Sequence, residues 1–370
     1  MLLAQTIVSY DLPAPKSSIH TKHHNRVRGN SWGFHGNFRN IAVMRDRQGP
    51  HISMNNQLFD LQTLAKFEHP QITADGQERA HVALSDPQTL WFNTGTLCNI
   101  TCENCYIESS PTNDRLVYIS QAEVRDFLAQ LKERNWGVRE IGFTGGEPFM
   151  NPEMNAMAAD CLSAGYEVLI LTNAMQPMMR KKVRDGLERL QATYGAQLTL
   201  RISVDHWSSV LHDKERGIGA FERTLEGMKW LRDTGIKMAV AGRTMWNETD
   251  EQSRAGFDAL FRAHGFDIDA FDPGQTVLFP EMDENADVPE ITTACWDILN
   301  KHPDQVMCSS SRMVVKRKGA DKPAVLACTL LPFTAEFELG ETLEQAESPV
   351  HLNHPHCSKF CVLGGASCTA

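Results

Sequence analysis

The sequence lacks a long apolar run, a recognisable export signal and an excess of positive charge. No stretch of about 18 apolar residues occurs, so a membrane-spanning helix is not expected. The segment MLLAQTIVSYDLPAPK has only a short apolar patch with no basic residue before it, unlike a secretory signal. The formal net charge of −10 argues against sequence-independent nucleic-acid binding, which depends on neutralising phosphates. We therefore expect a cytoplasmic protein that binds neither membranes nor nucleic acids.

Apolar residues make up 42% of the chain and charged residues 22%, as in a globular protein with one large domain and room for a smaller one. The first 50 residues are basic, in contrast with the acidic whole. This segment suits either a patch for an acidic partner or a solvated, partly ordered arm. Its charged side chains are Lys16, Lys22, Arg26, Arg28, Arg39, Arg45 and Arg47, with Asp11 and Asp46.

Cysteine is abundant, with ten residues in the chain. Disulfides are not expected in a reducing compartment, so clustered cysteines there indicate metal or redox chemistry. Three fall within residues 98–105 and five within residues 308–368, whereas Cys161 and Cys295 stand alone in helical patterns and are interpreted as small core residues. We therefore expect metal sites in two regions of the chain.

From residue 90 onward, short apolar runs alternate with amphipathic stretches of helical period. Helix signals fall between the runs: Ser120 and Glu123 form a capping box, and Gly165 and Gly235 each follow a helical stretch. Regular alternation of this kind predicts a parallel sheet covered by helices, as a full or partial barrel of α/β class. The predicted strands are Leu90–Thr94, Glu140–Phe143, Glu167–Leu171, Leu198–Val204, Lys237–Ala241 and Thr276–Phe279.

Changes in composition predict three parts. Residues 1–87 form an N-terminal extension that is partly irregular, because they show little periodicity. Residues 88–302 form the barrel. Residues 303–370 form a small cysteine-rich module, richer in serine, proline and glycine, with a hairpin over Met313–Ala327. A module with so little apolar sequence is expected to need a metal to fold.

Cys98, Cys102 and Cys105 follow the first predicted strand, in the segment LWFNTGTLCNITCENCYIE. Three thiolates from one loop can hold a four-iron cluster and leave one iron open for a ligand. In parallel β/α barrels reactive groups gather at the carboxyl ends of strands, where this loop lies. Taken alone, three close cysteines also suit zinc. The motif FTGGEP at Phe143–Pro148 ends the next strand, where its glycines let backbone approach a ligand closely, and it favours the cluster.

This cysteine spacing followed by TGGEP resembles the radical S-adenosylmethionine (radical SAM) superfamily, and the β/α pattern is similar to its partial (β/α)6 barrel. The resemblance implies that Cys98, Cys102 and Cys105 bind a [4Fe–4S] cluster whose open iron chelates S-adenosylmethionine (SAM). One electron then cleaves SAM to methionine and a 5′-deoxyadenosyl radical, which abstracts hydrogen from a substrate. A low-potential electron donor such as flavodoxin or ferredoxin is implied as a partner.

The resemblance also implies SAM contacts at the strand ends. The glycines and glutamate of TGGEP would receive the methionine amino group, Ser203 would contact the ribose, and Arg243 would pair with the carboxylate. The position before the third cysteine is often aromatic in the family but is Asn104 here, with Tyr106 as a candidate replacement. Ordinary strand-end capping and solvated charge are the alternative interpretation. The cofactor-binding candidates are Tyr106, Gly145, Gly146, Glu147, Asn173, Ser203, Asp205 and Arg243.

The C-terminal cysteines flank the predicted hairpin and then follow it. This arrangement resembles the twitch and SPASM extensions, which implies an auxiliary [4Fe–4S] cluster held by four of five cysteines. Zinc bound with His354 or His356, or free thiols, are the alternatives. The candidate ligands are Cys308, Cys328 and Cys361, with Cys357 or Cys368 as the fourth.

We expect a radical SAM oxidoreductase or transformase. Hydrogen abstraction by a radical needs no acid–base pair, so no catalytic residue is assigned. A small-molecule substrate is favoured, because residues 1–87 lack the strand–helix alternation expected of a leader-peptide-binding domain. Modification of a peptide or protein, as in ribosomal-peptide or sulfatase maturation, is the alternative. A non-catalytic iron–sulfur or zinc factor is a third interpretation, against which the retained motifs weigh.

Overall fold

A computed structural model describes residues 64–281 and 283–364, which belong to one compact unit, Phe59–Ala370. The basic first 50 residues, most of the predicted N-terminal extension and Cys368 lie outside the described residues. Within those ranges no helix is both long and apolar enough to cross a membrane.

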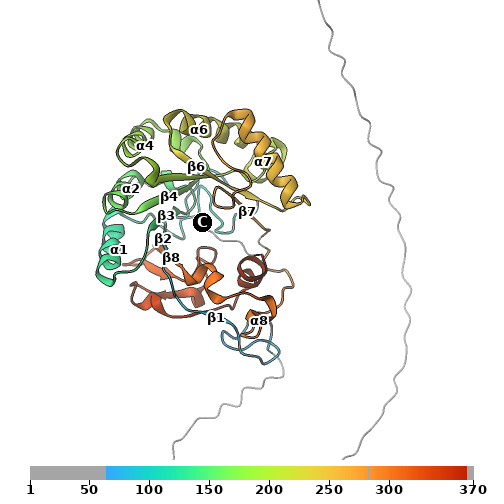
Figure 1. Ribbon diagram of the computed structural model, residues 1–370. Helices are drawn as coiled ribbons and strands as arrows, with labels where there is room; N and C mark the ends of the chain where they lie inside the picture. The colour runs from blue at the N-terminus through green and yellow to red at the C-terminus, as the bar shows by residue number, and fades with distance from the viewer. Residues whose placement is uncertain (1–63, 282, 365–370) are drawn as a thin grey trace, which may run out of the picture. The chain divides into compact units, whose positions relative to one another are not determined.

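Six parallel strands form the centre of the molecule, in the spatial order β2-β3-β4-β5-β6-β7. Each strand is next to the one that follows it in the chain, and helices lie along the outside of the strands (Figure 1). This is the predicted α/β fold, and each predicted strand is present within one or two residues. The strands are β2 (Thr89–Asn93), β3 (Glu140–Thr144), β4 (Glu167–Thr172), β5 (Leu198–Ser203), β6 (Lys237–Arg243) and β7 (Thr276–Phe279).

The helices between these strands begin and end where the sequence signals fall. At the first of them, Ser120 accepts from the backbone N–H of Glu123 and the Glu123 side chain accepts in return, which confirms the capping box. Gly235 ends another helix in the left-handed conformation. The main helices are α1 (Gln121–Arg134), α2 (Met154–Ser163), α4 (Lys181–Tyr194), α6 (Ala220–Thr234) and α7 (Asp250–His264), and the short ones are α3 (Gln176–Met179), α5 (Ser209–Arg216) and α8 (Cys295–Leu299).

The C-terminal segment extends this sheet. Strand β8 (Ser311–Val315) pairs in parallel with β2, on the side opposite β3, and β9 (Ala324–Leu326) pairs antiparallel with β8. The predicted hairpin over residues 313–327 is therefore confirmed, and β10 (Glu338–Gly340) continues the antiparallel arrangement. In Figure 1 β8 lies beside β2. The cysteine-rich segment is thus joined to the barrel by backbone hydrogen bonds.

The sheet separates two apolar cores, because successive side chains of a strand point to opposite faces. Leu90 and Phe92 of β2 pack with the helices, whereas Trp91 packs with the C-terminal segment, including Met313 and Phe360. This second core continues into a π-helix, η8 (Cys357–Leu363). The barrel and the C-terminal segment therefore share buried apolar area as well as a sheet.

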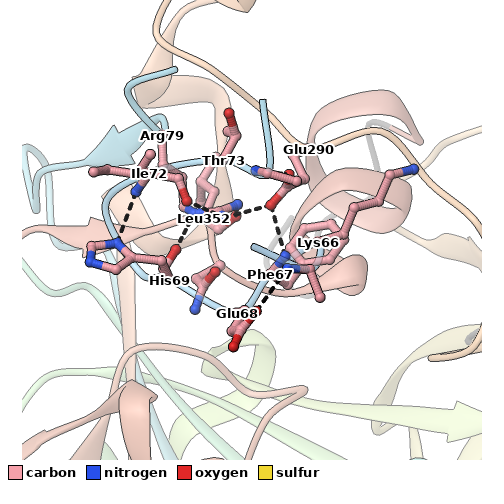
Figure 2. A network of polar contacts seen from close by, with 12 residues as sticks. Lys66, Phe67, Glu68, His69, Ile72, Thr73, Arg79, Glu290 and Leu352 are labelled. Carbon is pink, nitrogen blue, oxygen red and sulfur yellow. Dashed lines mark hydrogen bonds and ion pairs between the residues drawn. The ribbon is translucent and has the colours of Figure 1, made fainter. Parts of the chain in front are cut away.

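A buried ion pair ties the described start of the chain to the segment between β7 and α8 (Figure 2). Arg79 is 0% exposed, and its Nη2 lies 2.6 Å from Oε1 of Glu290. Glu290 also accepts from the backbone N–H of Phe67 at 2.7 Å. Next to this pair, strand β1 (His81–Val82) pairs antiparallel with β11 (Val350–His351). Together these contacts fasten residues 67–82 onto the C-terminal segment.

Candidate functional site

A cavity lies at the carboxyl ends of the barrel strands and has a volume of about 1050 Å³ including its mouth. It is lined by residues that follow β2, β3, β4, β5, β6 and β7, as expected for a parallel β/α arrangement. The sequence candidates in its lining are Cys98, Cys102, Cys105, Tyr106, Gly145, Gly146, Asn173, Ser203, Asp205 and Arg243.

The three cysteines of the first loop all face this cavity. Cys98 is 5% exposed and Cys102 and Cys105 are half-buried. The loop is fixed from both sides: the Cys98 N–H donates to the carbonyl of Ser110 at 3.0 Å, and the Ser109 N–H donates to Sγ of Cys105 at 3.3 Å. Burial raises the pKa of the Cys98 thiol to about 12, so binding a metal there would displace a proton.

Among residues 64–281 and 283–364, no three His, Cys, Asp or Glu side chains are arranged to hold a single metal ion. A single zinc ion draws each sulfur ligand to about 2.3 Å from one centre. A four-iron cubane instead spreads its thiolates over separate irons. Three thiols turned toward one cavity, close to exposed backbone, fit a cluster with one iron left open.

Gly145 and Gly146 bring the TGGEP turn against the strand end that leads into Cys98. A Cβ on Gly146 would lie 2.3 Å from the carbonyl oxygen of Leu97, and one on Gly145 would lie 2.6 Å from that of Gly95. Gly145 also has a φ of 138°, which favours glycine. The N–H of Gly146 donates to Gly95 O at 2.8 Å. Both glycines are therefore required for the close approach of the two loops.

Glu147 is absent from the cavity lining, although the sequence places it among the cofactor contacts. Its carboxylate accepts from the N–H of Asn173 and from Oγ1 of Thr172, both at 2.9 Å, and from the N–H of Phe149 at 3.2 Å. The side chain is 1% exposed, and burial raises its pKa to about 6. Here Glu147 fixes the end of β4 beneath the cavity, and a direct cofactor contact stays a prediction.

Asn173 contacts the start of the cysteine loop, and Tyr106 directly follows its last cysteine. The side-chain amide of Asn173 donates to Oδ1 of Asn99 at 2.9 Å, and its nitrogen lies 4.0 Å from Sγ of Cys98. Tyr106 lines the cavity and packs against the second core. Asn173 thus supports the loop near its first cysteine, and Tyr106 connects the loop with the C-terminal segment.

Three charged residues that line the cavity, Asp205, Arg216 and Arg243, form a network of ion pairs. Asp205 is 3% exposed and pairs with Arg216, whose Nε lies 2.5 Å from Oδ2. Arg243 lies 3.5 Å from Oδ1 of Asp205 and 3.7 Å from Oε1 of Glu215. Burial alone would raise the pKa of Asp205, but the charges of Arg216 and Arg243 hold it below its usual value. Asp205 is therefore an ionised counter-charge for two guanidinium groups.

Sequence reasoning missed Arg216 and Glu215, which end helix α5. Arg216 lines the cavity together with Cys98 and Cys102, and Glu215 is 3% exposed. The helix reads SVLHDKER, a charged sequence typical of a solvent-exposed helix. The sequence alone does not mark these residues as buried, because the two donors that Asn104 supplies to Glu215 are known only from the structure.

Four of the five C-terminal cysteine candidates lie in the second core: Cys308, Cys328, Cys357 and Cys361. Cys357 and Cys361 are four residues apart on η8, and Cys328 follows β9. Burial raises the pKa of Cys357 well above its usual value, and the neighbouring thiols of Cys328 and Cys308 raise it further. Cys368 lies outside the described residues.

Arg312 lies next to these thiols, is 1% exposed and donates to carbonyl groups, among them those of Cys308 at 2.5 Å and Ala346 at 2.8 Å. Within the described part of the chain no carboxylate pairs with it, whereas the buried Arg79 and Arg216 each pair with one. Burial lowers the pKa of Arg312 to about 10, and the Cys308 and Cys328 thiols oppose this shift. A buried cation without a counter-charge is costly, so this site favours an anionic group.

Comparisons with known proteins agree with this fold. The family described as the radical SAM superfamily matches residues 92–255. The subtilosin biosynthesis protein AlbA of Bacillus subtilis is 32% identical over 192 residues, which is 50% of this chain and 40% of AlbA. The AdoMet-dependent heme synthase of Methanosarcina barkeri is 30% identical over 150 residues, 39% of this chain and 38% of that protein. The chain thus spans about two fifths of these curated relatives.

Two solved structures share the fold at low sequence identity. Streptococcus suis SuiB bound to its precursor peptide SuiA has a TM-score of 0.52 and 14% identity, covering 72% of this chain and 66% of SuiB. Native anSMEcpe with bound AdoMet has a TM-score of 0.52 and 12% identity, covering 74% of this chain and 83% of that one.

The fold and the site define a parallel β/α barrel with three thiols at one cavity. Residues 92–255 of the chain match the radical SAM superfamily and form a radical SAM domain. The cofactors of that family are a [4Fe–4S] cluster and SAM.

Proposed function

We propose that Cys98, Cys102 and Cys105 hold the cluster and that the cavity beside them binds SAM. When bound, the cluster and SAM supply reductive cleavage to methionine and a 5′-deoxyadenosyl radical, which abstracts hydrogen from the substrate. The observation that carries this proposal is the convergence of the three thiols and five strand ends on one cavity. The residues that line the cavity would shield a radical from water.

The remaining lining residues would hold SAM. Backbone at Gly145 and Gly146 can approach the methionine amino group, because neither residue has a Cβ. Arg243, ion-paired but 14% exposed at its side chain, can meet the carboxylate. Ser203 and Asn173 present polar groups for the ribose. Tyr106 offers an aromatic ring for the adenine.

We further propose an auxiliary [4Fe–4S] cluster in the second core, held by Cys308, Cys328, Cys357 and Cys361, with Cys368 as the alternative fourth ligand. The thiols of Cys308, Cys328 and Cys357 are close enough for their charges to interact, and Cys361 packs against the same apolar core, which supports the proposal. Arg312 supports it independently, because thiolates would supply the missing negative charge. A zinc ion bound by four thiolates would also form an anionic group, and metal analysis of the protein distinguishes zinc from an iron–sulfur cluster.

The substrate we propose is a peptide or protein, modified oxidatively. Support comes from AlbA, which is named for bacteriocin biosynthesis, and from SuiB, solved with a precursor peptide. The sequence favoured a small molecule on the basis of residues 1–87, of which 1–63 lie outside the described residues. Relatives named heme synthase and probable GTP 3′,8-cyclase keep a small molecule as the second candidate. A flavodoxin or ferredoxin is the proposed electron donor.

The proposal is tested with anaerobically reconstituted protein, dithionite and SAM, and 5′-deoxyadenosine is measured by chromatography. The wild type and Cys161→Ala, a buried thiol outside the cavity, should both form 5′-deoxyadenosine. Cys102→Ala should form none. Substrate class is then tested with perdeuterated peptides encoded beside the gene and with nucleotide and porphyrin mixtures. Deuterium in 5′-deoxyadenosine identifies the substrate, and its absence with every peptide contradicts the peptide proposal.

A further inference from the structure

The two residues between Cys102 and Cys105 are bound to the last turn of helix α5. The Asn104 backbone N–H donates to Oε1 of Glu215 and its side-chain Nδ2 donates to Oε2, both at 2.8 Å. The N–H of Glu103 donates to the backbone carbonyl of Glu215 at 2.9 Å. One helical residue thus accepts three hydrogen bonds from the middle of the cysteine loop.

The Glu215 carboxylate depends on these donors. It is 3% exposed, and a buried carboxylate without hydrogen bonds is strongly unfavourable. Its other neighbour is Arg243, whose Nη1 lies 3.7 Å from Oε1 and whose Nη2 donates to the Asn104 carbonyl at 2.8 Å. Asn104 is therefore held through its N–H, its carbonyl and its side chain, and hydrogen bonds to charged groups are stronger than neutral ones.

This pairing also explains why the residue before Cys105 is polar in a sequence where the family resemblance leads us to expect an aromatic ring. A phenylalanine ring could not donate to Oε2, and one donor to the buried carboxylate would be lost. We propose that Asn104 and Glu215 are positioning residues, whose paired hydrogen bonds set the spacing of Cys102 and Cys105 for the cluster. The inference rests on the proposed function, in which these cysteines are cluster ligands.

The donor and acceptor pattern can be exchanged between the two residues. Asn104→Asp alone sets a carboxylate against a carboxylate. Glu215→Gln alone removes the charged acceptor, so any bond that a flip of the Asn104 amide restores is neutral and weaker. In the double variant Asn104→Asp/Glu215→Gln, the Gln amide donates to the Asp carboxylate and the Gln oxygen still accepts the backbone N–H. The summed charge of the pair is unchanged in the double variant. Glu188→Gln, on the exposed face of α4, is the matched control.

The experiment measures three properties of the anaerobically reconstituted protein: iron loss to a chelator, the electron paramagnetic resonance spectrum of the reduced protein with SAM, and kcat and KM for SAM. Each single variant should lose iron at least about tenfold faster than wild type, which corresponds to 1.4 kcal/mol and to the loss of about one charge-assisted hydrogen bond. The double variant should return to within about twofold of wild type in iron loss and recover the wild-type spectrum.

Hydrogen exchange of amides 103–107 in the metal-free protein separates the pairing from the cluster. Protection lost in both single variants and regained in the double variant supports the pairing. Single variants that behave like Glu188→Gln, or a double variant as impaired as the sum of the singles, overturn the inference. If the double variant regains amide protection but the wild-type protein binds no cluster, the proposed function is overturned, and the positioning role with it.

Discussion

The substitution Gly146→Ala tests how the TGGEP turn positions the first cysteine. A Cβ at this position would lie 2.3 Å from the carbonyl oxygen of Leu97 and 2.8 Å from that of Thr96. Ordinary contacts begin at 3.4 Å, so the turn must retreat by about 1.1 Å, the difference between 3.4 and 2.3 Å. The atoms it pushes against are backbone directly before Cys98, and they cannot rotate away as a side chain could.

Two hydrogen bonds cross this contact and would be weakened by the retreat. The N–H of Gly146 donates to Gly95 O at 2.8 Å, and that of Glu147 donates to Leu97 O at 3.1 Å. Their loss costs about 1–3 kcal/mol together, and overpacking about 1–3 kcal/mol more, so we expect about 2–6 kcal/mol of destabilisation. A displacement of about 1 Å at a reacting centre lowers the rate about 100-fold.

The matched control is Gly137→Ala, because a Cβ there would meet only the carbonyl oxygen of Pro87 at 3.7 Å. Neither glycine has a positive φ, so the two substitutions differ mainly in the contact they create. The free energy of unfolding is measured in urea, and SAM cleavage by the initial rate of 5′-deoxyadenosine formation. The reasoning is refuted if Gly146→Ala is as stable and as fast as Gly137→Ala.

Three further predictions follow from buried charges. Burial raises the pKa of Glu147 from 4.5 to about 6, so folding favours the protonated carboxyl group. This contribution to the free energy of unfolding is fully present below pH 4.5 and is lost as pH rises through 6. The unfolding free energy of the metal-free wild type, minus that of Glu147→Gln, should therefore fall by about 2 kcal/mol between pH 4.5 and 7; a difference independent of pH would contradict this. Arg79→Ala leaves Glu290 buried and unpaired and should destabilise by about 3–5 kcal/mol in urea, whereas Lys66→Ala, which breaks an exposed pair, should cost under about 1 kcal/mol. Arg312→Met removes a buried positive charge and should lower the reduction potential of the proposed auxiliary cluster in a redox titration; an unchanged potential would place that cluster elsewhere.

Periodicity was sufficient to predict the barrel. Alternating apolar runs and helix signals located β2 to β7, because burial on both faces of a parallel sheet imposes that pattern. It could not show that β8 pairs in parallel with β2, since strand order between distant segments depends on tertiary packing. The hairpin of β8 and β9 was predictable because it is local.

The site was predictable where it depends on motifs. The cysteine loop and the glycines of TGGEP line one cavity, as their strand-end positions indicated. Glu215 and Arg216 were missed, because a helix end of charged residues reads as solvent-exposed until the loop that covers it is known. For Glu147, the motif marked the residue, but only the three-dimensional structure shows its carboxylate turned toward Thr172 and Asn173.

The central claim is that Cys98, Cys102 and Cys105 hold the cluster that cleaves SAM. Anaerobic iron and sulfide content, measured together with 5′-deoxyadenosine formation under dithionite, tests it in the wild type and in the triple variant with alanine at all three positions. We predict about eight irons per wild-type chain and about four in the triple variant, with 5′-deoxyadenosine formation lost. Wild-type iron content and SAM cleavage in the triple variant, or no cleavage by a wild type that carries its full iron, would contradict the claim.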